Sequence, residues 1–398
     1  MIFSWRICLI VFTLLGGTWP TRLASAQAVA EIKATPAKVL DLPGTGTDET
    51  AIDYAQLPVL PGKHAVICPG ETTLKFQLHN YLLHHEGKFW CMWSQGPPVE
   101  DEPSQFIRYA TSEDGLKWSE PKSLSGSPPE GYGYIARGLW VREGELLALV
   151  AFFKGKGAFG VNKELKLQAH VWDGKAAAWK LKGTVADNAI NNFPPQRLSS
   201  GDWMTTKRDS RFNVSMLIGG VKSYDDWQAY PVVERSRIKG FSPDEPIWWE
   251  VAGASNSGAN SPEKKLVALF RDNGGSSRLF QAFSTDNGRS WSLPAISNFP
   301  NSTSKIFSLQ TTTGQRVLVS NANPKVGRRE LHLSVSTDGL TFRHMARLGI
   351  PSPKPGTLQY PHVIEHDGHL LIAFSRNKNQ SELFKVSLAD IGALLPMK

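Results

Sequence analysis

The chain has 398 residues, of which 41% are hydrophobic and 20% charged, and its formal net charge is +8 at pH 7. This length suits two ordinary domains or one large closed all-β domain. The lysines and arginines are scattered along the chain, which argues against an arm that binds nucleic acid. The positive excess is compatible with ordinary solvation and with attraction to an acidic substrate.

The first 26 residues have the pattern of a secretory signal peptide. Arg6 precedes an apolar stretch over residues 7–15, and the small residues Ala24-Ser25-Ala26 follow. We expect cleavage after Ala26 and a secreted or periplasmic protein. No later stretch reaches the roughly 18 consecutive apolar residues of a membrane helix, so no membrane span is predicted. Residues 27–50 are expected to form a flexible leader.

The cysteines and the short motifs give little sign of a cofactor. Outside the signal peptide only Cys68 and Cys91 remain, and they either pair or stay as buried thiols. The sequence has no Cys/His cluster with the spacing of a zinc site and no glycine-rich phosphate loop. We therefore expect neither a metal nor a nucleotide cofactor.

Short apolar runs separated by turn residues predict an all-β protein. A polar residue repeatedly opens an apolar strand, a tight turn follows, and a second strand ends in polar residues. The six opening residues are 53 to 60 positions apart: His79, Arg137, Arg197, Glu250, Lys305 and Tyr360. Six such units predict a six-bladed β-propeller of four-stranded antiparallel blades, as one domain over residues 51–398. A strand near residues 65–67 is expected to close the last blade.

A second motif recurs at the ends of later strands. Its copies are Ser112-Glu113-Asp114-Gly115-Leu116-Lys117-Trp118, residues 284–291 and residues 336–342, with a weaker echo at Trp172-Asp173-Gly174. In this motif Asp accepts hydrogen bonds from turn amides, Gly takes a positive φ, and the aromatic residue packs under the hairpin. The motif resembles the Asp-box, or bacterial neuraminidase repeat, of the sialidase superfamily. The resemblance implies that these aspartates are structural and lie away from the site.

The opening residues and the ends of the second strands are expected to converge at the mouth of the central channel. They form a basic, aromatic pocket suited to a carboxylate or sulfate on a sugar, because arginine offers paired donors in a planar fork. The predicted substrate-binding residues are Arg137, Arg197, Arg208, Arg271, Lys305, Arg329 and Arg376. The expected partner is an acidic oligosaccharide or polysaccharide.

The resemblance to sialidases, which covers about residues 75–392, also implies catalytic roles. Sialidases use a Tyr nucleophile paired with a Glu, an Asp acid/base, and three arginines on the substrate carboxylate. On this sequence the resemblance assigns Tyr360 as nucleophile, Glu250 as its partner and Asp101 as the acid/base. It also assigns Arg271 to the carboxylate, with Arg328 or Arg329 as a further arginine.

The first blade departs from the sialidase pattern. Sialidases open this blade with an arginine, and here the position is His79, which removes one charge-assisted hydrogen bond to a sialic-type carboxylate. The histidine is similar to one thought catalytic in propeller enzymes that act on rhamnose linked to glucuronic acid. Histidine titrates near neutrality and can exchange protons with a glycosidic oxygen or a uronate C5 proton.

These candidate residues are compatible with three functions. The leading one is an exo-acting glycoside hydrolase that removes an acidic or acid-linked terminal sugar of an extracellular glycan, with His79 or an acidic loop residue as proton donor. The second is a lyase or rhamnose-glucuronate-active enzyme with His79 as acid/base. The third is a propeller that binds glycans without catalysis.

Overall fold

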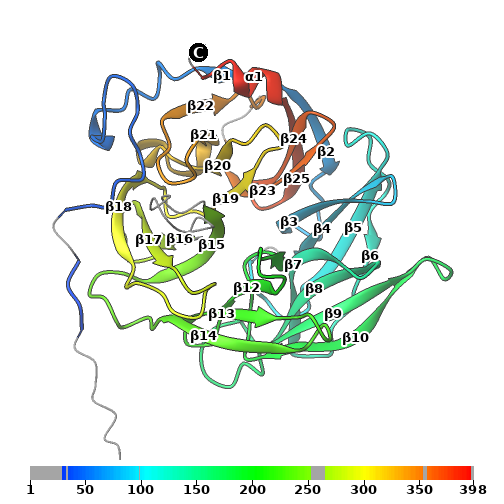
Figure 1. Ribbon diagram of the computed structural model, residues 1–398. Helices are drawn as coiled ribbons and strands as arrows, with labels where there is room; N and C mark the ends of the chain where they lie inside the picture. The colour runs from blue at the N-terminus through cyan, green and yellow to red at the C-terminus, as the bar shows by residue number, and fades with distance from the viewer. Residues whose placement is uncertain (1–28, 33–34, 98, 252–264, 353–355, 396–398) are drawn as a thin grey trace, which may run out of the picture.

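The computed structural model describes residues 29–32, 35–97, 99–251, 265–352 and 356–395. The predicted signal peptide lies outside these ranges. Six sheets are arranged as blades around a central axis (Figure 1), as the spacing of the opening residues predicts. In the described residues, no helix is both long and apolar enough to cross a membrane.

The first three blades follow one another along the chain and are antiparallel. Their strands, from the channel outward, are β3 (Phe76–His85), β4 (Lys88–Gly96), β5 (Phe106–Ser112) and β6 (Lys122–Ser123); β7 (Tyr132–Arg142), β8 (Glu145–Lys154), β9 (Lys166–Asp173) and β10 (Ala178–Asp187); and β11 (Gln196–Arg197), β12 (Trp203–Arg208), β13 (Val214–Gly219) and β14 (Trp227–Val233).

The last three blades complete the circle. Their strands are β15 (Pro243–Val251), β16 (Lys265–Asp272), β17 (Arg278–Ser284) and β18 (Ala295–Pro300); β19 (Phe307–Gln310), β20 (Arg316–Ser320), β21 (His332–Ser336) and β22 (His344–Leu348); and β23 (Leu358–His366), β24 (His369–Arg376) and β25 (Gln380–Ser387). The 3-10 helices η1 (Glu49–Ala51) and η2 (Pro324–Arg329) and the α-helix α1 (Leu388–Gly392) complete the elements of the described residues.

An N-terminal strand closes the ring. The strand β2 (Lys63–Cys68) pairs antiparallel with β25 and becomes the outer strand of the sixth blade, which confirms the expectation for residues 65–67. Pairing this N-terminal strand with the last strand of the chain joins the first and last parts of the propeller in one sheet. A shorter strand, β1 (Val59–Leu60), adds in parallel to β22 of the fifth blade. Cys68 and Cys91 are free buried thiols.

The segment expected to be a flexible leader is in part held against the propeller. Residues 37–42 run along the outside of blades four and five, where Val39 and Leu40 are each 1% exposed. The Asn298 side-chain oxygen accepts their two backbone N–H groups at 2.8 and 2.9 Å. The sequence of this segment gives no sign of that partner, because Asn298 lies about 260 residues away.

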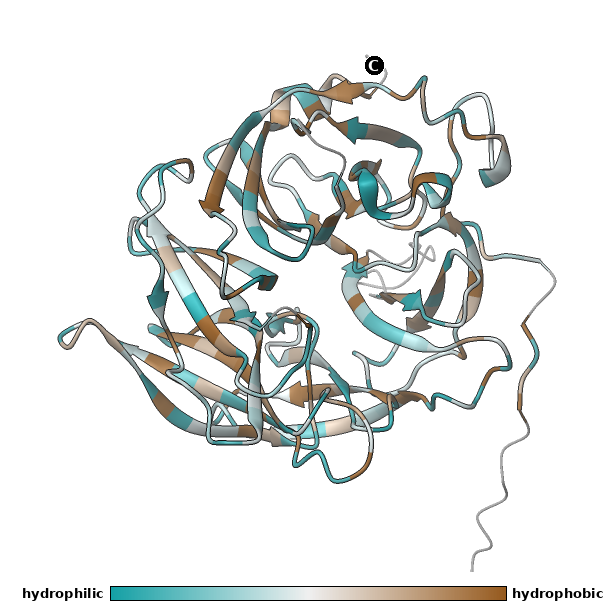
Figure 2. Ribbon diagram, turned by 180° about the vertical axis from the view of Figure 1, so that it is seen from behind, coloured by the Kyte–Doolittle hydropathy of each residue, from teal (hydrophilic) through white to brown (hydrophobic). Residues whose placement is uncertain are grey.

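Core residues fill the spaces between the blades. Figure 2 shows hydrophobic stretches on the strands and hydrophilic residues mainly on the connecting loops. The channel itself is filled by aromatic rings, in which Phe193 contacts Tyr81, Phe307 and His362 with centroid separations of 6.1, 4.6 and 5.8 Å. The channel is therefore packed below its mouth.

The Asp-box motifs form the turns that the sequence predicts. In the copy at residues 336–342, the Asp338 carboxylate accepts the N–H groups of Leu340 and Thr341 at 2.8 Å. Gly339 has a φ of 70°, and its carbonyl accepts the indole N–H of Trp249 from the neighbouring blade at 2.9 Å. Each such turn follows the third strand of its blade and so links the end of that strand to the residues packed between neighbouring blades.

Bulges at the start of the inner strands position the channel mouth. The pairing of the first and second strands shifts register between Leu78 and Tyr81 in β3, between Ala136 and Gly138 in β7, between Asp244 and Ile247 in β15, and between Gln359 and His362 in β23. Three of the bulges hold a non-glycine residue at positive φ: His79 at 61°, Glu245 at 42° and Tyr360 at 58°. A bulge redirects a side chain that regular pleating would turn elsewhere.

Replacing Glu382 tests how much the ring closure contributes to stability. Its carboxylate has no exposed surface and joins β25 to Arg376 at 2.5 and 2.8 Å and to His64 of β2 at 2.8 Å. We expect Glu382→Gln to lower the free energy of unfolding by about 3–5 kcal/mol in chemical denaturation, because it leaves Arg376 without its counter-charge.

The same carboxylate also predicts a pH dependence. Burial would raise the pKa of Glu382, but hydrogen bonds from His64 and Arg376 hold it below the usual value. The stabilisation is therefore present above the ordinary glutamate pKa and is lost as the pH falls through the lowered value. The exposed Glu113→Gln is the control, and an equal loss of stability in both variants would contradict this role.

Replacing Asp338 tests the structural role of the Asp-box. Asp338→Ala removes the acceptor of two turn amides, so we expect a loss of about 1 kcal/mol in the free energy of unfolding, as for a helix cap. Catalytic constants measured on the folded protein should not change. A selective loss of activity without a change in melting temperature would contradict the structural role.

Candidate functional site

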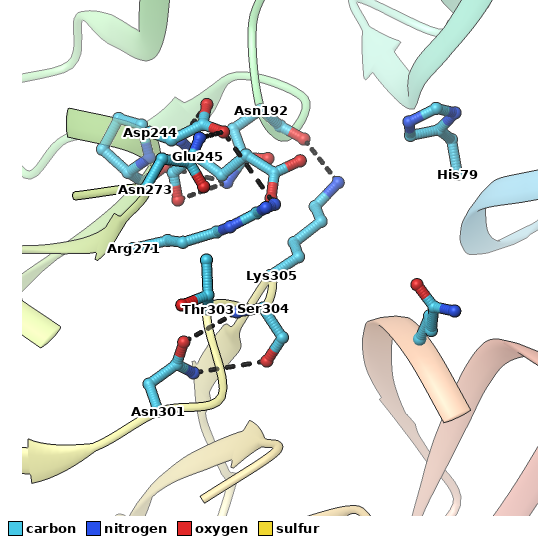
Figure 3. A network of polar contacts seen from close by, with 12 residues as sticks. His79, Asn192, Asp244, Glu245, Arg271, Asn273, Asn301, Thr303, Ser304 and Lys305 are labelled. Carbon is cyan, nitrogen blue, oxygen red and sulfur yellow. Dashed lines mark hydrogen bonds and ion pairs between the residues drawn. The ribbon is translucent and has the colours of Figure 1, made fainter. Parts of the chain in front are cut away.

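The channel mouth brings together one polar or aromatic residue from each blade. The six, in blade order, are His79, Arg137, Asn192, Glu245, Lys305 and Tyr360, and all are buried. Figure 3 shows Lys305 reaching across the mouth toward Asn192, with Asp244, Glu245 and Arg271 on one side and His79 on the other.

Side-chain amides of the third blade tie this ring together. Asn192 Nδ2 donates to the carbonyl oxygens of Glu245 and Pro246, each at 3.0 Å. Asn191 Nδ2 donates to the carbonyl oxygen of Arg137 at 3.1 Å. The bulged strands leave these carbonyls without a ladder partner, so the amides both satisfy them and fix the backbone of the ring.

Glu245 belongs to a buried network of carboxylates and guanidinium groups. Arg271 Nη1 lies 2.8 Å from Glu245 Oε2 and 3.9 Å from Asp244 Oδ2, and Arg208 pairs with Asp244. Burial would raise the pKa of Glu245, but Arg271, Lys305 and Arg208 hold it well below its usual range. Glu245 is therefore a carboxylate at neutral pH.

Tyr360 is close enough to this carboxylate for the charge of Glu245 to act on its hydroxyl. Burial, and then the charges of Glu245 and Glu100, raise the pKa of the Tyr360 hydroxyl. The Tyr360 ring contacts His79 edge to face, with 5.0 Å between centroids. The site therefore holds a protonated phenol next to an anionic carboxylate, which is the arrangement of a nucleophile and its base.

Lys305 forms the floor of the site. Its Nζ donates to the Tyr81 hydroxyl at 2.8 Å and to the Asn192 carbonyl at 3.3 Å. It also lies 4.6 and 4.4 Å from the ring centroids of Tyr81 and Phe193. Burial is the main reason why the pKa of Lys305 lies well below its usual value, although Glu245 opposes the shift.

His79 is held in one orientation by its neighbours. The Ser94 hydroxyl accepts the Ala136 N–H at 2.9 Å and forms a hydrogen bond of 3.1 Å with His79 Nδ1, whose direction depends on the tautomer of the ring. The other nitrogen, Nε2, faces Glu100 Oε1 at 3.6 Å. Burial, then Arg137 and Lys305, lower the pKa of His79 well below 6.5, so the ring is neutral at pH 7.

Asp101 comes to the site from the loop between β4 and β5. Its N–H donates to Gln105 Oε1 at 3.1 Å, and its carbonyl accepts the Gly157 N–H at 2.8 Å. Its Oδ1 is buried and has no hydrogen-bond partner. Burial, and then Glu100, raise the pKa of Asp101 to about 7, which suits a general acid at neutral pH.

The site includes Arg328 rather than Arg329. Arg328 donates to Gln359 Oε1 at 2.6 Å and to the Thr303 carbonyl at 2.5 Å, next to Tyr360. The exposed Arg329 donates to the Val326 carbonyl within its own turn. The kink at Gly327, with a φ of 64° and a ψ of −133°, points the two neighbouring side chains in different directions.

Three other residues that the sequence placed at the channel mouth lie elsewhere. Glu250 is near the far end of β15, where its carboxylate accepts from Ser199. Arg197 is exposed and lies over the Trp203 ring at 5.7 Å. Arg376 is held by Glu382 on the side of the sixth blade.

The residues that occupy their places were missed because the repeat placed the opening of these two blades five residues too late in the chain. Glu245 takes the position expected for Glu250, and Asn192 takes that expected for Arg197. The missed signal is a proline: Glu245-Pro246 and Tyr360-Pro361 both lie within a bulge, where a proline leaves no ladder donor unpaired. Within the described ranges, no group of three potential metal-ligating side chains is found.

Comparisons with known proteins agree with this architecture. Residues 240–372 match the family described as BNR repeat-like domain. Among solved structures, a protein of unknown function from Dyadobacter fermentans has a TM-score of 0.65 at 14% identity, covering 83% of this chain and 100% of that one. No curated protein matches the sequence.

Sialidases are also among the similar structures. The Trypanosoma rangeli sialidase in complex with sialic acid has a TM-score of 0.60 at 14% identity, covering 92% of this chain and 61% of that one. Another structure described as a sialidase has a TM-score of 0.58 at 16% identity, and this chain spans 35% of its length. The repeat match, the six blades and the shared fold together make this chain a sialidase-like β-propeller of the BNR-repeat type.

Proposed function

We propose that this chain is an exo-acting glycoside hydrolase that removes an acidic or acid-linked terminal sugar from an extracellular glycan. The observation that carries the proposal is the placement of Tyr360, Glu245 and Asp101 in one buried, arginine-rich site. The predicted signal peptide supports export, so the substrate is proposed to be met outside the cytoplasm.

The residues fit a two-step displacement. Tyr360 attacks the anomeric carbon while Glu245 takes the phenolic proton, and Asp101 gives its proton to the leaving glycosidic oxygen. In the second step Asp101 takes a proton from water, the hydroxide releases the sugar from the tyrosine oxygen, and Glu245 returns the phenolic proton. A phenol suits this reaction because a carboxylate nucleophile would be repelled by an acidic sugar.

A lyase is the second candidate, favoured by the neutral state of His79. A neutral imidazole can accept the C5 proton of a uronate, with a nearby arginine neutralising the carboxylate. Product spectroscopy separates the candidates, because a lyase creates an unsaturated uronate with a new ultraviolet absorbance and a hydrolase does not. A propeller that only binds glycans would consume no substrate.

Replacing the nucleophilic pair tests the hydrolase. On a glycan identified from a panel of uronate-, rhamnose-, fucose- and sialic-acid-capped substrates, Tyr360→Phe should lower kcat/KM by about 10³-fold or more, since it removes the attacking oxygen. Glu245→Gln should cost about 10²- to 10⁴-fold by removing the base. The control is Tyr230→Phe on the outer strand of blade three, with melting temperatures measured for all variants. Full turnover by folded Tyr360→Phe would rule out the nucleophile.

The pH profile tests Asp101 as the acid. Because its pKa is raised to about 7, Asp101 is protonated below that pH, and kcat/KM on a natural disaccharide should fall about tenfold per pH unit above it. Asp101→Asn should remove this alkaline limb. The variant should also lose far less activity on a nitrophenyl glycoside, whose leaving group needs no proton. Equal losses on both substrates would argue against an acid role.

A further inference from the structure

We propose that the acidic group of the substrate is the C5 carboxylate of a terminal hexuronic acid, and that Arg137 binds it. This inference rests on the proposed function, because it assigns the substrate class of the same site. It depends on which cations of the site are already paired and which are free.

Arg137 differs from the other buried arginines in having no counter-charge. Of the four arginines below 10% exposure in the described part of the chain, three have a carboxylate within 4 Å: Arg142 with Glu143, Arg208 with Asp244, and Arg271 with Glu245. Arg137 is 3% exposed, and the described residues provide it with no ion pair. Its Nε and Nη1 are buried without an acceptor.

An unpaired guanidinium is costly to bury. Each unsatisfied buried donor costs free energy, and a buried charge costs more unless it is paired. The planar fork of arginine also matches the two oxygens of a carboxylate. An arginine held in this state at the mouth of a channel is therefore arranged for an anion that arrives with the substrate.

The backbone fixes Arg137 in place. Its carbonyl accepts from Asn191 Nδ2 at 3.1 Å, and Arg137 is itself the residue left unpaired in the bulge of β7. The next residue, Gly138, has a φ of 129°, and a Cβ there would lie 2.6 Å from Pro194 Cδ. The side chain therefore projects from a backbone that cannot adjust freely.

Arg137 lies on the side of the site that holds the proposed acid. The preceding residue, Ala136, donates its N–H at 2.9 Å to the Ser94 hydroxyl, which contacts His79. Gly157, from the loop between β8 and β9 of the same blade, donates its N–H to the Asp101 carbonyl at 2.8 Å. Arg137 projects from blade two, whereas Tyr360 belongs to blade six. In the ring of six, blade one, which carries His79, lies between these two blades.

The cations on the side of Tyr360 are already occupied. Arg271 bonds Glu245 at 2.8 Å, and Arg328 donates to Gln359 and to the Thr303 carbonyl at 2.6 and 2.5 Å. Lys305 Nζ, 5.5 Å from the centroid of the Tyr360 ring, donates to the Tyr81 hydroxyl at 2.8 Å and to the Asn192 carbonyl at 3.3 Å. The position on blade one carries His79 rather than a permanent cation. An anion bound directly beside the nucleophile would therefore have to displace existing partners.

The position of the free cation distinguishes two classes of sugar acid. In a 2-keto sugar acid such as sialic acid, the carboxylate is bonded to the anomeric carbon and must lie beside the nucleophile. In a hexuronic acid it is bonded to C5, across the ring oxygen, and points away from the nucleophile. With the anomeric carbon over Tyr360, Arg137 fits the second class.

Paired aryl glycosides test this assignment. We expect the wild-type protein to hydrolyse p-nitrophenyl glucuronides or galacturonides with a higher kcat/KM than the matching neutral hexosides and than the sialoside. Arg137→Gln should lower kcat/KM on the uronide by about 10- to 100-fold, the effect of one charge-assisted hydrogen bond, and lower kcat/KM on the neutral hexoside by much less. Its melting temperature without ligand should not fall, because no native ion pair is lost. The exposed Arg197→Gln is the matched control.

The outcomes separate this inference from the proposed function. Cleavage of the sialoside but not the uronides, or an equal loss on uronide and hexoside in Arg137→Gln, would overturn the inference and leave the hydrolase intact. If none of the glycosides is cleaved, the proposed hydrolase activity is refuted. Calorimetric titration with free glucuronate, galacturonate, glucose and N-acetylneuraminate then tests the anion site by itself. Uronate binding that Arg137→Gln abolishes supports the anion site, and its absence in the wild type refutes it.

Discussion

The bulge at the start of the inner strands is the constraint on which the channel mouth depends. In regular pleating, alternate side chains of an inner strand face the two neighbouring blades. The bulges in β3, β7, β15 and β23 interrupt this alternation where each strand reaches the mouth. Residues at positive φ there, such as His79 and Tyr360, present their side chains to the centre. The cost of this backbone strain is met by the surrounding blades, and the result is a ring of chemically different residues.

Burial then decides the charge state of each member of the ring. Glu245 stays anionic because three cations lower its pKa. Asp101 has no hydrogen bond to its buried Oδ1, and its pKa is raised to about 7. Two carboxyl groups in one site thus acquire opposite roles from their surroundings, one suited to act as a base and the other as an acid. His79 is neutral for the same physical reason.

The scaffold keeps this arrangement rigid. Amides from blade three bind the carbonyls that the bulges leave free, and the rings below the mouth fill the channel. The blades are also tied together at the outside, by β2 at the ring closure and by the Asp-box turns. A site built from six blades needs such connections, because a shift of one blade would move its residue relative to all the others.

The repeats in the sequence were sufficient to predict the architecture. The spacing of the opening residues and the Asp-boxes follow from local chemistry, in which turns need Asp and Gly and strands need alternating apolar residues. The same reasoning correctly placed the strand β2 in the last blade. It did not foresee that residues 37–42 pack on the propeller, because Asn298, which binds them, is distant in sequence.

The candidate site was predictable only in part. The repeat correctly indicated His79, Arg137, Lys305 and Tyr360, and the acidic loop indicated Asp101. In place of Glu245 and Asn192, however, the repeat indicated Glu250 and Arg197, which lie elsewhere on the same blades. The repeat placed the opening of these two blades five residues too late in the chain, and in β15 a bulge also changes which side chains face the channel. The sequence by itself determined the six-bladed fold, because its signals are local and repeated. Which carboxylate acts on Tyr360, and which buried arginine has no counter-charge, was decided by the tertiary structure, since both depend on contacts between blades.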